Sequence, residues 1–188
     1  MAHERLKNTV LKTASFLLSG ALSFGCTPTN SDPTLPNGFS RVDCSEAKVS
    51  MAKPDNWHFK EESSGSTRAC FVTKEEIQPG KLFDTGFSLN MIPNASQRFR
   101  KRPSQVAEEY INNPPLVLIK PTGEASCITE GDIRSCTRNF TIGDRKDYLL
   151  KISGNDGTDK FYLMWFEQPI GGPDLEQGKT ILGSIKFN

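Results

Sequence analysis

The chain has 188 residues, of which 36% are hydrophobic and 24% are charged, and its formal net charge is +1. This length favours a single domain with appendages, and the composition is typical of a globular domain with a hydrophobic core. A nearly neutral chain lacks the basic surface that nucleic-acid binding requires, so we expect no nucleic-acid partner.

The N-terminus has the order of an export signal. A short basic region at residues 1–12 precedes an uncharged, mostly apolar run from Thr13 to Gly25. That run has about 13 residues, whereas a transmembrane helix needs about 20, and its apolar side chains would surround a helix rather than form one stripe. Residues 1–25 are therefore predicted to be a signal peptide.

The segment LSFGC at residues 22–26 resembles the lipobox of bacterial lipoproteins, in which a small residue precedes a cysteine that receives lipid and becomes the N-terminus. Gly25 and Cys26 fit this motif, whereas Ser23 and Phe24 depart from it. We expect lipid on Cys26 to hold the protein on the bacterial cell envelope, facing the periplasm or the exterior. Each buried CH₂ of an acyl chain contributes ~0.8 kcal/mol to such an attachment. Signal cleavage without lipidation is the alternative.

A proline-rich tether is predicted to follow the anchor. Residues 26–37 place Pro28, Pro33 and Pro36 among small polar residues, and proline both prevents helix and disfavours sheet. The folded domain is then predicted to occupy residues 38–188.

Strands dominate the predicted domain. From Gly86 to Ile92 apolar residues alternate with Ser88 and Asn90, which is the pattern of a half-buried strand. Similar segments lie between residues 49 and 74 and between 124 and 168, separated by Gly-Asp and other turn sequences. Residues 153–160, although rich in aspartate and asparagine, are predicted to be a hairpin turn rather than a calcium loop.

Two helices complete the prediction. The first covers residues 104–113, with Ser104 as its N-cap, and the second covers residues 173–187. Gly178 and Gly183 weaken the second helix by roughly 1 kcal/mol each and are expected to mark its close approach to the sheet. About seven strands and two helices predict an α+β domain, with an antiparallel sheet flanked by helices.

Four cysteines remain for the folded domain once Cys26 is assigned to the anchor. A two-residue loop at Gly131-Asp132 would place Cys127 opposite Cys136 as a non-hydrogen-bonded pair, with Cα atoms ~4.5 Å apart, within reach of a disulfide. Cys44 and Cys70 are then left for each other by elimination, and export favours disulfides over free thiols. The cysteine spacing lacks the C-x-x-C pairs of zinc sites, so no metal is expected.

The sequence offers no catalytic constellation. His58 is the only histidine outside the predicted signal, and no nucleophile, metalloprotease or nucleotide-binding motif is present. We therefore expect neither enzymatic activity nor a cofactor.

Five segments together resemble the PsbP-like proteins, a fold shared by the photosystem extrinsic protein PsbP and a Ran-binding nuclear import factor. The uncharacterised prokaryotic members are the most similar. The resemblance spans roughly residues 47–187 and implies an α/β/α sandwich with a non-enzymatic binding or assembly role. The segments are VSMAKPDNWHF at 49–59, ACFVTKEEI at 69–77, GKLFDTGFSLNMI at 80–92, FYLMWFEQP at 161–169 and GKTILGSIKF at 178–187.

Two functional hypotheses follow. The first is an envelope lipoprotein that is anchored through lipid on Cys26 and whose domain binds or scaffolds an unidentified envelope protein. The second is a small-ligand carrier or enzyme that uses an open sheet face lined by Trp57, His58, Tyr162 and Trp165.

Overall fold

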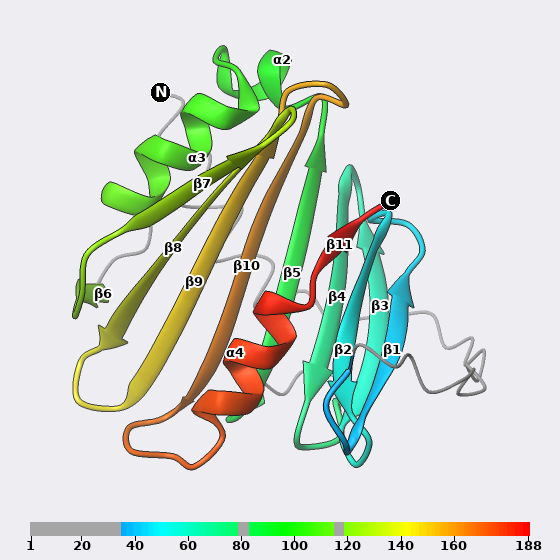
Figure 1. Cartoon of the computed structure of the whole chain (residues 1–188), viewed down its shortest axis with the longest axis vertical. Coiled ribbons are helices and arrows are strands. Elements are labelled where there is room, and N and C mark those ends of the chain that lie inside the picture. The colour runs from blue at the N-terminus through cyan, green and yellow to red at the C-terminus, as the bar shows by residue number, and fades with distance from the viewer. Residues whose placement is uncertain (1–34, 79–82, 115–118) are drawn as a thin grey trace.

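The computed structural model describes residues 35–78, 83–114 and 119–188. In this part of the chain the strands form two antiparallel sheets, and the larger sheet has the strand order β3-β4-β5-β10-β9-β8-β6, with β7 also paired to β8 (Figure 1). The strands of this main sheet are β3 (His58–Ser64), β4 (Thr67–Thr73), β5 (Gly86–Pro93), β6 (Ile119–Pro121), β7 (Ser126–Glu130), β8 (Ile133–Ile142), β9 (Lys146–Asn155) and β10 (Lys160–Pro169).

The smaller sheet joins the two ends of the domain. It has the order β1-β2-β11, so the last strand pairs with a strand near the start of the domain. Its members are β1 (Phe39–Cys44), β2 (Val49–Pro54) and β11 (Lys186–Phe187). Strands β1, β6 and β11 were not predicted from the sequence. Strands β6 and β11 are too short to show a period of two, and β1 mixes polar and apolar residues on both of its faces.

Two layers cover the main sheet from opposite sides. On one side, the α4 face, the small sheet and helix α4 (Leu175–Gly183) pack on Leu149, Met164 and Phe166. On the other side, the α3 face, helices α2 (Ala95–Phe99) and α3 (Pro103–Asn112) pack on Leu150, Ile152 and Leu163. The α+β prediction is confirmed, with α2 as an additional short helix.

The central strand β5 differs from its prediction. Its alternating pattern predicted one solvated face, yet Ser88 and Asn90 are buried together with the apolar residues between them. The Ser88 hydroxyl and the Asn90 side-chain carbonyl have no hydrogen-bond partner among the described residues. The alternating pattern identified the strand correctly. However, the polar residues at every second position did not reveal that both faces of the strand are covered.

The β9–β10 turn anchors both helices of the α3 face, which corrects the predicted N-cap. Helix α3 begins at Pro103, so Ser104 lies inside the helix instead of capping it. The Asp156 carboxylate accepts hydrogen bonds from the Ser104 amide at 2.9 Å and from its hydroxyl at 2.6 Å. Asp159 receives the same two bonds from Ser96 of α2, at 2.7 and 2.9 Å. The segment is the predicted hairpin turn, and its carboxylates stabilise positively polarised helix N-termini.

One of the two glycines of α4 lies against the sheet. A Cβ atom on Gly178 would lie 2.3 Å from the Phe166 ring, so only a hydrogen fits between helix and strand. The prediction is wrong for Gly183, around which no atom lies within 4 Å of a Cβ position. It is also wrong for the helix end, because α4 stops at Gly183 and the chain continues into β11.

Candidate functional site

The four residues predicted to line one ligand-binding face do not share a face. Tyr162 and Trp165 are an odd number of positions apart on β10, so their side chains point to opposite sides of the sheet. Trp57 and Tyr162 are only 6% and 1% exposed within the core under the α4 face, whereas Trp165 packs on the other core. His58 is exposed at the start of β3. The prediction of an aromatic-lined face is therefore wrong.

A different surface is left open by the layers. Helix α4 and the small sheet lie over β10, β5, β4 and β3, and none of the described helices covers the same side of β7 and β8 (Figure 1). The register places the side chains of this uncovered area on the α4 face, where Ser135 is buried against Ser153 and the other side chains are not buried. We call this surface the open half-face; it consists of Ser126, Ile128, Glu130, Thr137 and Asn139.

The open half-face combines polar groups with one apolar anchor. Ile128 is 57% exposed, which makes it one of only two large hydrophobic side chains in the described residues with such exposure. Around it lie hydroxyl, amide and carboxylate groups. A surface of this composition suits a reversible protein contact, in which a polar rim surrounds a small apolar centre.

A cavity of about 250 Å³ lies where the open half-face meets helix α4. The ammonium of Lys151 donates a hydrogen bond to the main-chain carbonyl of Leu182 at 3.0 Å. Burial lowers the pKa of Lys151, and the negative charge of Glu130 partly opposes that effect. The cavity is lined by Thr137, Leu149, Lys151, Lys179, Leu182 and Gly183.

A second group of charged residues lies on the α3 face at the start of β9. Glu167 is nearly buried and forms an ion pair with Lys146 at 2.9 Å. The Tyr148 hydroxyl also donates to Glu167, and burial together with this carboxylate raises the pKa of Tyr148 far above its ordinary value. Both partners of Glu167 stabilise its buried charge.

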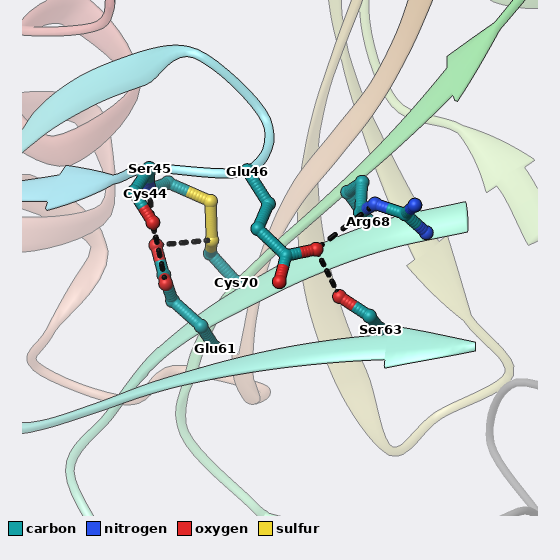
Figure 2. The surroundings of a disulfide bond; sticks show 7 residues. All are labelled: Cys44, Ser45, Glu46, Glu61, Ser63, Arg68 and Cys70. Carbon is teal, nitrogen blue, oxygen red and sulfur yellow. Dashed lines mark hydrogen bonds and ion pairs between the residues drawn. A yellow bond between two sulfur atoms is a disulfide. The ribbon is translucent and has the colours of Figure 1, made fainter. Parts of the chain in front are cut away.

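The disulfide between Cys44 and Cys70 joins the small sheet to the main sheet. Its Cα atoms are 6.2 Å apart, and both residues are fully buried. Figure 2 shows that the Glu61 carboxylate lies beside it, 3.9 Å from the Cys70 sulfur. Glu61 accepts hydrogen bonds from the Ser45 amide and from its hydroxyl. The two sulfurs of Cys44 and Cys70 and a carboxylate oxygen of Glu61 lie within 4.8 Å of one another, which is close enough to ligate one metal ion. Sulfurs joined in a disulfide, however, are not the thiolates that bind metal.

A second carboxylate ties the same turn to the main sheet. Glu46 accepts a hydrogen bond from the Ser63 hydroxyl and pairs with Arg68 at 2.9 Å (Figure 2). The β1–β2 turn is thus held by one covalent and two polar links. These links fix how the small sheet sits on the main sheet.

The second disulfide links β7 to β8. Cys127 pairs directly with Cys136 across the hairpin, and Glu130 pairs with Ile133 next to the turn, which is the predicted register. The two Cα atoms are 4.0 Å apart. Both cysteine pairs of the domain thus lie at disulfide distance, as predicted, and such bridges persist in oxidising compartments outside the cytoplasm.

Cys26 and the predicted signal and tether up to residue 34 lie outside the described residues. None of the helices in the part of the chain that the structure describes has the length and apolar character needed to cross a membrane.

Comparison with known proteins gives fold likenesses only. No protein-family model matches the chain, and no curated protein matches it. The solution structure of cyanobacterial PsbP from Synechocystis matches 86% of this chain and 100% of its own, with 12% identity and a TM-score of 0.47. The Ran-binding protein Mog1p of Saccharomyces cerevisiae matches 79% of this chain and 95% of its own, with 6% identity and a TM-score of 0.45.

A crystal structure from Bacteroides thetaiotaomicron also matches 79% of this chain. Its TM-score is 0.45 at 15% identity, and the match spans 48% of that longer chain. PsbP and a Ran-binding protein are the two proteins that the sequence motifs resemble.

Lys151 and the open half-face were not predicted from the sequence. Lys151 lies in an alternating strand, where a lysine is ordinarily exposed, and nothing in the sequence reports that α4 folds over it. The sequence feature that could have indicated the open half-face was the row of polar residues on one side of β8. Thr137 and Asn139 occupy positions that would carry apolar residues if a layer covered them.

Proposed function

We propose that this protein is a lipid-anchored component of the bacterial cell envelope whose domain binds an envelope protein without catalysing a reaction. The observation that carries the binding role is the open half-face. Helix α4 and the small sheet cover the rest of the α4 face, and the uncovered part presents an exposed isoleucine within a polar surround. Partner contact at this surface would bury Ile128 and pair the neighbouring hydroxyl and amide groups.

The anchor is argued from the sequence. The apolar run before Cys26 is too short to span a membrane, and a proline-rich segment separates it from the first strand at Phe39. The four other cysteines pair among themselves, so Cys26 has no cysteine of the domain left to bond with. A lipid on its sulfur would account for the odd cysteine.

Metabolic labelling with a clickable palmitate analogue tests the anchor. Wild-type protein is expected to incorporate the label and to remain with the membrane fraction, whereas Cys26→Ala is expected to lose both. As a control, Ser23→Leu brings the segment closer to the lipobox and should label as strongly as the wild type. Equal labelling of wild type and Cys26→Ala would show that the anchor is wrong.

Site-specific photo-crosslinking in the living cell tests the binding surface. A photoreactive residue at Ile128 or Asn139 is expected to give a discrete crosslinked product of higher mass. The same residue at Gln97, which is also exposed but belongs to α2 on the other side of the sheet, should give none. A product from Gln97 alone, or from all three positions equally, would place the partner elsewhere.

A further inference from the structure

The ammonium of Lys151 is an unusual charge for its position. The side chain extends from β9 beneath the last turn of α4 and reaches the Leu182 carbonyl. An ammonium has three donors, and Leu182 is its one acceptor among the described residues. No described carboxylate lies within ion-pair distance of it. A mostly buried charge normally has a partner, because leaving water carries a large cost in free energy.

The cavity next to this ammonium offers room for such a partner. Its wall is apolar at Leu149 and Leu182, and Thr137 contributes the one hydroxyl. Lys179 also borders the cavity, but its ammonium is paired with Glu176 at 2.7 Å. Lys151 therefore supplies the unpaired positive charge next to the cavity, and the Glu130 carboxylate, which interacts with it electrostatically, lies beyond ion-pair distance.

The size and chemistry of the cavity define the ligand. At about 250 Å³ the cavity lies below the range of roughly 300–1,000 Å³ for drug-sized ligands, so the ligand is small. One positive charge matches a monoanion, whereas a phosphate dianion would leave a negative charge uncompensated against leucine side chains. The apolar wall suits a short hydrocarbon chain.

From this arrangement we infer that the cavity between α4 and strands β8 and β9 binds a small aliphatic carboxylate. The carboxylate accepts hydrogen bonds from the Lys151 ammonium and the Thr137 hydroxyl, and the hydrocarbon chain lies against Leu149 and Leu182. Burial lowers the pKa of Lys151 and the negative charge of Glu130 only partly opposes that effect, so a further anion next to the ammonium would be favourable. Ligand binding would therefore raise that pKa. The site is independent of the lipid anchor, but it shares Thr137 with the open half-face.

Hexanoate serves as the probe, and two-dimensional NMR of the folded domain as the readout. We expect saturable shifts centred on the amides of Thr137, Lys151 and Leu182, with a dissociation constant of about 1 mM for a ligand of this size. Hexan-1-ol and hexylammonium, which share the chain but lack the negative charge, should bind at least tenfold more weakly. Shifts that do not saturate, or equal binding of hexan-1-ol, would overturn the inference.

Lys151→Met keeps the length of the side chain and removes its charge. Loss of a charge-assisted hydrogen bond should weaken hexanoate binding by about 10- to 100-fold. Lys151→Arg should retain most of the affinity, and Lys120→Met on the exposed strand β6 should bind like the wild type. Because Lys151→Met removes a partly desolvated charge, it should remain folded. Unchanged hexanoate affinity in this variant would exclude Lys151 as the carboxylate-binding residue.

Discussion

Gly178→Ala is expected to lower the free energy of unfolding by about 2–3 kcal/mol. The added methyl group would lie 2.3 Å from the Phe166 ring, which is fully buried and stacks near Trp57 with ring centroids 6.3 Å apart. Overpacking of this kind typically costs about 1–3 kcal/mol. The ring has no free space to enter, so the helix must move away from the sheet and lose contacts with it.

Gly183→Ala is the matched control on the same helix. Nothing lies within 4 Å of its Cβ position, and its backbone does not have the left-handed conformation that favours glycine. Alanine has the higher helix propensity, by about 1 kcal/mol in a helix interior, so this variant should be as stable as the wild type or slightly more stable. Denaturant unfolding of both variants measures the contrast. Equal loss of stability in the two would mean that α4 does not pack on Phe166 through Gly178.

Removing the Cys44–Cys70 disulfide should have an effect of similar or greater size. The double variant Cys44→Ala/Cys70→Ala is expected to lose roughly 3–4 kcal/mol, because the bond closes a loop across 26 residues and its removal frees the unfolded chain. It also leaves two small cavities at fully buried positions, and the β1–β2 turn keeps only the polar links through Glu46 and Glu61.

The second disulfide provides the comparison. Cys127→Ala/Cys136→Ala opens a loop across only 9 residues, and Cys127 is partly exposed, so a smaller loss of about 2–3 kcal/mol is expected. Equilibrium unfolding without reductant measures both double variants. A loss at Cys127 and Cys136 equal to or larger than that at Cys44 and Cys70 would contradict the role of the latter bond as the link between the two sheets.

Local pattern was enough to predict most of the main sheet. Residues 86–92 alternate with a period of two, and the Gly131-Asp132 loop set the β7–β8 register that brings Cys127 opposite Cys136. A two-residue loop leaves one way for the flanking residues to pair, which is why this prediction held without tertiary information. The helix at α3 could be located for a similar reason, since its apolar stripe lies within one short segment.

The cap of that helix could not be predicted from its own residues. Serine is a residue type favoured at N-caps, yet Ser104 lies inside the helix. The carboxylate that accepts the hydrogen bond from its amide belongs to Asp156, which lies 52 residues further along the chain. Gly178 and Gly183 likewise look equivalent in the sequence, although only Gly178 touches the sheet. A contact between distant segments depends on where each segment is placed, and a residue's identity does not carry that information.

The sequence by itself determined most strands of the main sheet, the Cys127–Cys136 pair and the case for export, because these depend on residue types at short spacing. The tertiary structure decided which sheet face is covered and where. The packing of these layers left Ile128 exposed and placed the Lys151 ammonium under the end of α4. The physical reason is that a strand shows two equivalent faces until other layers pack on them. The choice between the faces is made by the hydrophobic contacts of segments far apart in the chain.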